Sequence, residues 1–346
     1  MGGMARGDQQ ACPSAAFDTL AGSGPANRAF LRHRWFAAPQ PNPVAGVIAS
    51  GRDGLPLAAF ALAERRKGPF TLREVAGCYW PFRGVPLAEG VSEGELAAAL
   101  ASRSRDLGPV WRLGPAEAGD AALDTLIAAA RRAGWQVLTR PLGKVYELDI
   151  AALTADDGWP SAKTLRKNRW RRRRLEEEGG AIRTESFRGT DWNAAHRDAM
   201  AAIEAASWLG SLDDGGDTKF LDPAMRAYWE DLCADPALAA MLFGSLMWIG
   251  DVPAAFTFGI EAGDTRYYIA NNFDQRFTRF GPGRVLLYED FARAAEGGVT
   301  RISWGLGDAG YKSEMGARPG ADMVDLLFVR GGLLAALLRP WWTRGS

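Results

Sequence analysis

Short apolar segments alternate with runs of glycine, proline and charged residues along the whole chain. In the first half, three apolar segments are divided by Gly-Arg-Asp-Gly and by Arg-Arg-Lys-Gly-Pro, which is typical of antiparallel strands joined by turns. These strands are expected over residues 44–50, 55–64 and 71–77. Helical spacing of apolar positions follows over 92–106 and 121–133, and strands are expected at 110–113, 135–139 and 144–150.

The second half repeats this plan. A charged helix is expected over 161–178, then a strand at 181–187 and helices over 192–207 and 223–234. Three more strands follow over 239–249, 252–261 and 265–270, then a loop, a helix over 284–296 and strands at 301–304 and 323–329. The repeated order predicts an α/β (α+β) protein with two tandem lobes. Each lobe is expected to hold a mixed, mostly antiparallel sheet flanked by helices.

The chain divides into four segments on this interpretation. Residues 1–26 lack sustained periodicity and are expected to form a mobile arm. The two lobes are expected over 27–155 and 156–330, followed by a tail at 331–346. The apolar tail segment from Leu333 to Trp342 is expected either to dock on its lobe or to touch a membrane surface.

Chain length and net charge limit the classes of function that the protein can have. A chain of 346 residues is long enough for two domains, because single cores rarely grow much past about 250 residues. Lys plus Arg and Asp plus Glu both number 41, and this balance argues against a protein whose main task is to coat nucleic acid. We therefore expect no DNA partner, and any polyanion site must be local.

The cysteine and histidine residues exclude several chemistries. The three cysteines lie far apart without a Cys-x-x-Cys pair, so they predict neither a disulfide framework nor a common zinc motif. Only His33 and His196 are present, without a nucleophile motif nearby, which disfavours hydrolase triads and metal sites. No signal peptide and no run of about 18 apolar residues is found. We expect a cytoplasmic protein without a metal.

The segment Gly281-Pro282-Gly283-Arg284 is a candidate phosphate site. Gly281 and Gly283 permit a tight turn before a helix whose first N–H groups are unpaired, and Arg284 adds a positive charge. This arrangement can hold a pyrophosphate. An ordinary turn remains the alternative, because glycine and proline occur in turns of every kind.

The helix over 161–178 is a second candidate phosphate site. Eight cations lie around its circumference, and three glutamates at its end can pair with some of them. Either this is a solvated charged helix, or it binds the phosphates of CoA, a nucleotide-activated sugar or tRNA. We select Lys167, Arg171 and Arg174 as its substrate-binding residues.

Four features together resemble a known family. They are the basic helix, the strand end from Tyr268 to Asp274, the turn 281–283 with Leu286, and the segment 305–312 that ends in Tyr311-Lys312. They are similar to the GNAT acetyltransferase domain of the cellulose-biosynthesis CelD type, which is related to the FemABX peptidyltransferases. The similarity covers roughly residues 160–316. It implies twin GNAT lobes, an acyl-CoA co-substrate, and transfer to an amine or hydroxyl in a cleft between the lobes.

The resemblance also implies residue roles. Asn271 and Asn272 follow a strand at the end where GNAT strands splay to admit the donor, although they are equally suited to a turn. Trp80 and Trp208 lie in loops that the resemblance puts near the cleft, and we select them as contacts for a sugar or acyl group. Two departures are present: Thr278 replaces the Gln or Arg of the usual pyrophosphate motif, and Ser303 stands where an acidic residue is common.

Acyl transfer requires a proton acceptor, stabilisation of the oxyanion and protonation of the leaving group. We assign Tyr311 as the general acid, Lys312 as a cation near the tetrahedral intermediate or the donor phosphate, and Asp308 as the base. A loop carboxylate and a packed ring are the alternatives for Asp308 and Tyr311.

The sequence thus predicts an N- or O-acyltransferase that acts on a sugar, a polysaccharide precursor or a small amine. Two other functions are compatible with the same residues. A Fem-like aminoacyl-tRNA-dependent transferase would use the basic helix to contact tRNA. A catalytically silent GNAT-fold binding protein would account for Ser303 and for the altered phosphate motif.

Overall fold

A computed structural model describes residues 14–67, 70–155, 158–212, 217–308 and 310–344. The chain forms two units. Unit 1 comprises Met1–Lys144 and Ala321–Ser346, and unit 2 comprises Val145–Gly320. Two strands, β5 and β11, begin in one unit and end in the other.

Unit 1 is a mixed sheet with helices packed on it. Its strands lie in the order β1-β2-β3-β4-β11-β5, with β3 and β4 parallel and β1/β2, β2/β3 and β4/β11 antiparallel. The strands are β1 (Val44–Ser50), β2 (Pro56–Lys67), β3 (Phe70–Val75), β4 (Val110–Glu117), β5 (Trp135–Asp149) and β11 (Arg318–Arg330). The helices are α1 (Ser14–Ser23), α2 (Glu93–Ser102), α3 (Ser104–Leu107), α4 (Ala121–Arg132) and α12 (Gly332–Arg344), with short 3₁₀ turns at η1 (Ala26–Arg28) and η2 (His33–Ala37).

Large aromatic and aliphatic side chains fill the core of unit 1. The indole of Trp111 on β4 stacks on the ring of Phe328 on β11, with centroids 3.6 Å apart. Helix α12 buries Ala335 and Trp342 against Leu138 and Leu327 of the sheet. The guanidinium of Arg140 lies 4.5 Å from the Trp342 ring. The tail therefore docks on a folded unit, as the first expectation had it, but this is unit 1 and not the C-terminal lobe that precedes the tail in the sequence.

Unit 2 has the strand order β5-β10-β9-β8-β7-β6, with β9 and β10 parallel and the other pairs antiparallel. Its own strands are β6 (Ile182–Arg188), β7 (Leu242–Ile249), β8 (Val252–Ala262), β9 (Thr265–Phe273) and β10 (Arg301–Leu306). The helices are α5 (Ile150–Ala155), α6 (Ala162–Gly179), α7 (Ala194–Ala206), α8 (Pro223–Leu232), α9 (Pro236–Met241), α10 (Pro282–Glu296) and α11 (Tyr311–Glu314), with 3₁₀ turns η3 (Trp208–Ser211) and η4 (Gln275–Phe280).

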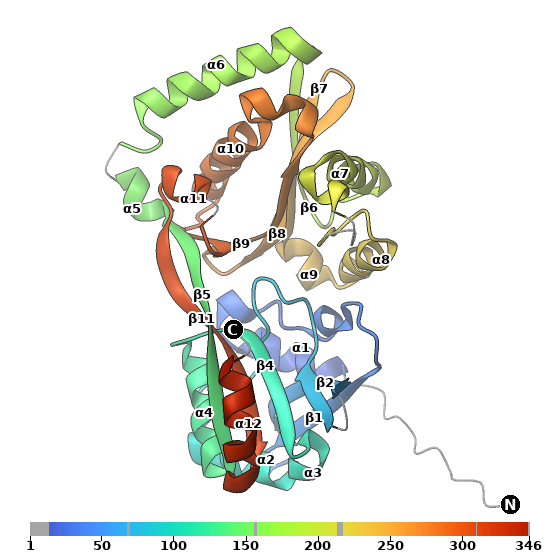
Figure 1. Ribbon diagram of the computed structural model, residues 1–346, viewed down its shortest axis with the longest axis vertical. Coiled ribbons are helices and arrows are strands. Elements are labelled where there is room, and N and C mark those ends of the chain that lie inside the picture. Colours follow the sequence, from blue (N-terminus) through green and yellow to red (C-terminus); the bar gives the residue numbers. More distant parts are fainter. Residues whose placement is uncertain (1–13, 68–69, 156–157, 213–216, 309, 345–346) are drawn as a thin grey trace, which may run out of the picture. The chain divides into compact units, whose positions relative to one another are not determined.

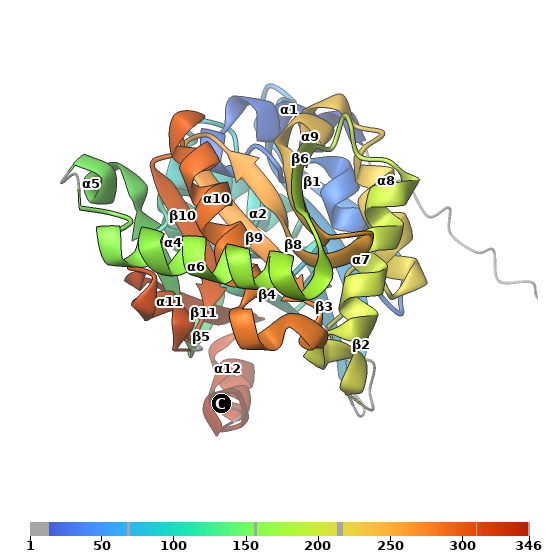
Figure 2. The same cartoon turned by 90° about the horizontal axis from the view of Figure 1, so that it is seen from above.

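Helices cover both faces of the unit 2 sheet. Helices α10 and α7 lie on opposite faces of β8 and β9 (Figure 1). Helix α6 runs across α10 and the ends of the strands (Figure 2), where it also packs against η4. Leu175 of α6 is buried against Ile249 and Phe277, so an apolar side of this charged helix is fixed to the unit.

The two halves of the chain repeat one topology. In each half, three antiparallel strands are followed by a helix and by a strand parallel to the third: β1-β2-β3, α2 and β4, then β7-β8-β9, α10 and β10. The last strands of the two halves are exchanged. β5, the last strand of the first half, pairs with β10 of the second half, and β11, the last strand of the second half, pairs with β4 of the first half. The predicted tandem duplication of mixed, mostly antiparallel sheets is confirmed.

Three local predictions need correction. The arm predicted at 1–26 is helical over Ser14–Ser23, because Phe17, Leu20 and Ala21 are buried apolar anchors; residues 1–13 lie outside the described residues. The strands predicted at 135–139 and 144–150 are one strand, β5. The first residues of the strand predicted at 239–249 belong to α9, because Asp235 caps a helix that Pro236 starts.

The predicted lobe ranges, 27–155 and 156–330, differ from the two units. The difference arises because the strand exchange divides β5 at Lys144 and β11 at Gly320, and because α12 packs on unit 1. None of the helices in the described parts of the chain is long and apolar enough to cross a membrane.

Candidate donor site in unit 2

Strands β9 and β10 separate partway along the sheet of unit 2. They pair in parallel only from Thr265/Arg301 to Tyr267/Ser303. Beyond this point β9 continues to Phe273, while β10 remains paired with β5 as far as Leu306 and Val145. Backbone N–H and C=O groups on this side of β9 are therefore available to an extended ligand.

The turn 281–283 follows the open end of β9. Gly281 has the left-handed φ of 58° that ends η4 and starts α10, and Pro282 occupies the first helical position. Among the described residues, none accepts a hydrogen bond from the Gly283 N–H. A Cβ on Gly283 would lie 3.2 Å from Cδ1 of Phe273, so the turn approaches β9 closely. The start of α10 thus presents an N–H and a positive dipole beside the opening.

Two arginines flank this turn. Arg284 on α10 pairs with the Glu314 carboxylate at 2.7 Å, and Arg171 on α6 donates to Asn168 Oδ1 at 3.0 Å. Burial, and then the positive charge of Arg284, lower the pKa of Arg171. Two guanidiniums close enough to repel each other share Glu314, so the cluster carries a net positive charge. Such a cluster suits an anion with more than one charge, such as a pyrophosphate.

Tyr311 and Asn271 join the two sides of the opening. Asn271 lies on β9 beyond the last pair with β10, and its side chain acts on the Tyr311 phenol at the start of α11 by lowering its pKa. The Tyr311 ring packs edge-on against Trp304 of β10, with centroids 5.4 Å apart. Burial raises the pKa of Tyr311, so the phenol remains protonated at neutral pH. Asn272, the next residue, is buried.

Lys312 is directed into the protein. Its side chain is only 6% exposed, and Nζ donates to the carbonyl oxygens of Gly305, Leu306 and Gly307 at 3.2, 3.3 and 2.7 Å. Burial lowers the pKa of Lys312 to about 8, against the opposing effect of the Asp308 carboxylate. Three acceptors match the three donors of an ammonium group. The contacts of Lys312 therefore order the loop that follows β10.

Asp308 is exposed on the same loop. Its carboxylate accepts hydrogen bonds from the Ser313 hydroxyl and, at 2.8 Å, from the Gly310 N–H. The Ser313 hydroxyl lowers the pKa of Asp308. An exposed, fully ionised carboxylate is a weak base, and these contacts tie the loop to α11.

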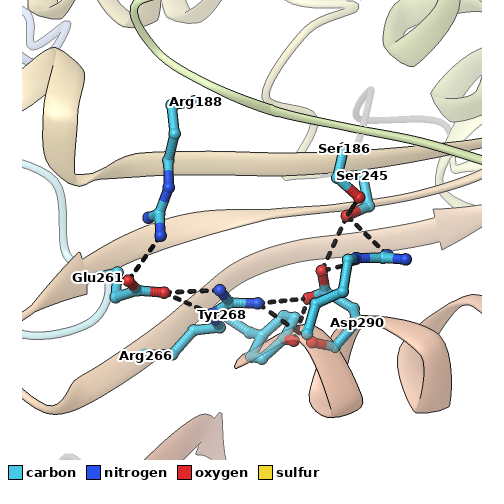
Figure 3. A network of polar contacts seen from close by, with 8 residues as sticks. Ser186, Arg188, Ser245, Glu261, Arg266, Tyr268 and Asp290 are labelled. Atoms are coloured by element: carbon cyan, nitrogen blue, oxygen red, sulfur yellow. Dashed lines mark hydrogen bonds and ion pairs between the residues drawn. The ribbon is translucent and has the colours of Figure 1, made fainter. Parts of the chain in front are cut away.

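A buried polar network anchors β9 to α10 (Figure 3). Asp290 of α10 accepts hydrogen bonds from the Tyr268 phenol and from Ser245 Oγ at 2.8 Å, and its carboxylate pairs with Arg266 at 3.1 Å. Arg266 also pairs with Glu261 at 2.6 Å. Tyr268 is the first residue of β9 beyond its pairing with β10. The network therefore fixes β9 where the opening begins.

Unit 1 has no comparable opening in its described residues. Its parallel strands, β3 and β4, also stop pairing early, after Glu74/Arg112. The segment after β3 covers the strand edges beyond this point. The Arg83 N–H donates to the Pro115 carbonyl of β4 at 2.7 Å, and the Ala59 N–H of β2 donates to the Pro86 carbonyl at 3.2 Å. Unit 2 is therefore the unit with room for an extended donor.

The structure brings together most of the residues that the sequence selected. Asn271, Gly281, Gly283, Arg284, Arg171, Tyr311, Lys312 and Asp308 all border the opening, the turn or the loop after β10. The other selected residues have different surroundings. Lys167 is exposed on α6, Arg174 pairs with Glu177 at 2.6 Å, Trp208 is exposed in η3, and Trp80 is half-buried in unit 1.

Sequence reasoning missed the acidic and aromatic partners. Glu314, which pairs with Arg284, stands three residues after Tyr311, a spacing that places both on one short helix. Tyr288 of α10 lies beside Thr164 and Arg171 of α6, and α10 packs against the basic helix. Within the described parts of the chain, no group of three or more His, Cys, Asp and Glu side chains is placed to hold a metal ion.

Comparisons with known proteins agree with this geometry. Residues 162–313 match the model of the acetyltransferase (GNAT) domain. The structure of FemX aligns with a TM-score of 0.61 at 14% identity, over 95% of this chain and 99% of that chain. A conserved protein of unknown function from Bacteroides thetaiotaomicron aligns with a TM-score of 0.56 at 14% identity, over 93% and 99%.

The C-terminal domain of a putative lysylphosphatidylglycerol synthetase from Agrobacterium fabrum aligns with a TM-score of 0.52 at 13% identity, over 94% of this chain and 93% of that chain. The comparison with curated proteins found no match. At these identities the structures establish the fold alone. The matched segment lies within unit 2 and contains the opening, the turn and Tyr311. The match over residues 162–313 to the acetyltransferase (GNAT) domain indicates a GNAT-type acyltransferase.

Proposed function

We propose that unit 2 transfers an acyl group, in the first instance acetyl, from acyl-CoA to an amine or hydroxyl group. The observation that carries this proposal is the separation of β9 from β10 directly before the turn 281–283. An extended pantetheine can pair with the free edge of β9 while its pyrophosphate meets the start of α10. Arg171 and Arg284 supply positive charge at that end.

The transfer step can be assigned to residues around the opening. The acceptor nitrogen or oxygen attacks the thioester carbonyl carbon, and the C–S bond breaks as the tetrahedral intermediate collapses. Tyr311 gives its phenolic proton to the departing thiolate, a role that its raised pKa supports because the proton is present at neutral pH. The acceptor loses its proton to Asp308 or to bound water. Lys312 holds the loop after β10 and so positions Tyr311.

The acceptor that we propose is a sugar, a polysaccharide precursor or a small amine. This choice rests on the resemblance to the CelD type, and the expected cytoplasmic location agrees with the use of acyl-CoA. Trp80 and Trp208 are the side chains that we propose for acceptor contact. Their alanine variants should raise the KM for the acceptor while the affinity for CoA stays constant.

Mass spectrometry provides the direct test. The protein is incubated with acetyl-CoA and longer acyl-CoA thioesters and with a panel of amino sugars, sugars and amines. A product heavier by one acyl group, together with free CoA, is expected. Absence of transfer from every thioester, in a preparation that binds none of them, would remove acyl-CoA as the donor.

A second candidate is transfer from aminoacyl-tRNA. The observation in its favour is the exposed side of α6, where Arg166, Lys167, Arg169 and Arg173 face solvent. A thermal-shift comparison of CoA, UDP-sugars and tRNA separates the two candidates, because a ligand that binds the native state raises its melting temperature. Stabilisation by tRNA alone would favour the second candidate.

A further inference from the structure

Beside the turn 281–283, the surface of unit 2 holds an aromatic hollow that the transfer step does not use. Its volume is about 430 Å³. Trp170 of α6 and Phe280 of η4 line it and meet edge to face, with ring centroids 5.7 Å apart. Phe280 is buried, whereas Trp170 is 43% exposed. A tryptophan with this exposed fraction has an aromatic surface available for a ligand.

Two arginines and two glutamates line the hollow around the two rings. The Arg174 guanidinium lies 5.9 Å from the Trp170 ring, and the Arg279 guanidinium lies 5.3 Å from the Phe280 ring. Arg174 is paired with Glu177 at 2.6 Å. Arg279 has no carboxylate partner in the part of the chain that the structure describes. The hollow thus combines a stacking surface with an arginine, Arg279, that forms no ion pair among the described residues, and the carboxylate of Glu178 also lines it.

The position of the hollow indicates which ligand it would bind. Phe280 directly precedes Gly281, so the hollow begins where the proposed pyrophosphate site ends. A base that stacks on an aromatic side chain and a phosphate that pairs with arginine are the two parts of a phosphorylated nucleoside. The end of CoA beyond its pyrophosphate is a 3′-phosphorylated adenosine.

We propose that Trp170 stacks on the adenine ring of the acyl-CoA donor and that Arg279 pairs with its 3′-phosphate. The inference rests on the proposed function for the source of the nucleotide, and it adds the residues that recognise this end of the donor. It assigns to α6 a specific contact in place of a general attraction for polyanions.

Calorimetry with three ligands tests the proposal: CoA, dephospho-CoA, which lacks the 3′-phosphate, and 4′-phosphopantetheine, which lacks the whole nucleoside. Trp170→Ala should weaken CoA binding roughly five- to tenfold and leave 4′-phosphopantetheine unchanged, because base stacking on an aromatic side chain has about this value. Trp170→Leu, which still covers Phe280, should weaken CoA binding by the same factor. Arg279→Ala should weaken the binding of CoA but not the binding of dephospho-CoA.

Trp341→Ala is the matched control, since Trp341 is 47% exposed and lies on α12 of unit 1. It should change none of these affinities. Equal losses for CoA and 4′-phosphopantetheine in Trp170→Ala would mean that Trp170 only packs the turn, and this would overturn the proposal. Unchanged CoA affinity in Trp170→Ala would overturn it as well.

A fourth probe, adenosine 3′,5′-bisphosphate, separates this proposal from the proposed function. If the protein binds neither CoA nor 4′-phosphopantetheine, acyl-CoA is not the donor. Binding of the bisphosphate that Trp170→Ala weakens would then still support the adenosine site, and absence of binding would overturn both. If Trp170→Ala weakens the binding of tRNA and no adenosine nucleotide binds, the hollow is a tRNA contact and the proposal fails.

Discussion

The Arg284 guanidinium and the Glu314 carboxylate form an ion pair of 2.7 Å between the first turn of α10 and the last residue of α11. One end of this pair lies at the turn that we assign to the donor pyrophosphate, and the other lies on the helix that starts with Tyr311. The phosphate site and the proton donor are thereby linked through two side chains. A ligand phosphate that takes over Arg284 would compete with Glu314.

Glu314→Gln should strengthen CoA binding about two- to fivefold. The substitution removes the carboxylate that competes for Arg284 and makes the cluster with Arg171 more positive. Calorimetry at two salt concentrations gives the measurement, and the gain should shrink at high salt. Weaker binding in this variant would show instead that Glu314 is needed to orient Arg284.

Gly283→Glu should weaken CoA binding at least tenfold. Its Cβ would lie 3.2 Å from the Phe273 ring, and its carboxylate would repel the pyrophosphate at the start of α10. Gly94→Glu is a matched control, because Gly94 occupies the corresponding second position of α2 and has nothing within 4 Å of its Cβ. An unchanged CoA affinity in folded Gly283→Glu would place the donor site elsewhere.

Tyr311→Phe should lower kcat roughly 10²-fold while the affinity for CoA stays within twofold, which is ordinary for the loss of a general acid. The variant keeps the ring contact with Trp304 and loses the hydroxyl that faces Asn271. Asn271→Ala is the control for this neighbour and should lower kcat less. Full activity in Tyr311→Phe, with only a lower melting temperature, would make Tyr311 a structural residue.

Activity should fall as the pH rises above about 8, the pKa to which burial lowers Lys312. The neutral amine has two donors for the three carbonyls of Gly305, Leu306 and Gly307, so the loop loses a contact. Lys312→Arg should remove this descending limb from the pH profile of kcat. A limb that persists unchanged in Lys312→Arg would belong to another group.

The stability of the protein should depend on the pKa of Lys312 in the opposite direction to its activity. Because the pKa of Lys312 is about 8 in the folded protein and 10.5 for an ordinary lysine in water, the unfolded chain binds more protons between these two pH values. The contribution of Lys312 to the free energy of unfolding therefore rises with pH through this window and is lost as the pH falls through about 8. Urea unfolding of the wild type and Lys312→Met at pH 7.5 and 10 measures the difference.

Asp290→Ala should lower the free energy of unfolding by about 3–5 kcal/mol, because it leaves buried Arg266 without one of its carboxylates. Tyr268→Phe should cost less, about 1–2 kcal/mol, since a single hydrogen bond to a charged group is lost. Asp124→Ala on the exposed side of α4 serves as the control, with a change below about 1 kcal/mol. Equal stability of Asp290→Ala and the control would contradict the anchoring role of the network.

The sequence predicted elements well where local signals act alone. Ser92 and Glu95 predicted the start of α2, and the structure shows Ser92 accepting from the Glu95 N–H at 3.2 Å. The turn 281–283 predicted the start of α10 within two residues, because glycine and proline punctuate the chain at that point. Such signals depend on a few neighbouring residues, and a pattern along the chain reveals them.

Long-range pairing decided the features that the sequence did not predict. Helix α1 is short and weakly amphipathic, and only burial of Phe17 and Leu20 against unit 1 distinguishes it from a loop. The pairs of Lys312 with three carbonyls and of Arg284 with Glu314 join residues whose proximity depends on the completed fold. The motif indicated which residues cluster, and the contacts of each side chain emerged only from the structure.

The exchange of terminal strands has a practical consequence for anyone who wishes to dissect this enzyme. A fragment cut to the matched residues 162–313 would lack residues 145–149, and β10 would then present its bare backbone along one side. Unprotected strand margins recruit other chains, so such a fragment should self-associate instead of remaining monomeric. We therefore expect each half to need the terminal strand of the other, and a catalytic fragment should keep residues 145–149.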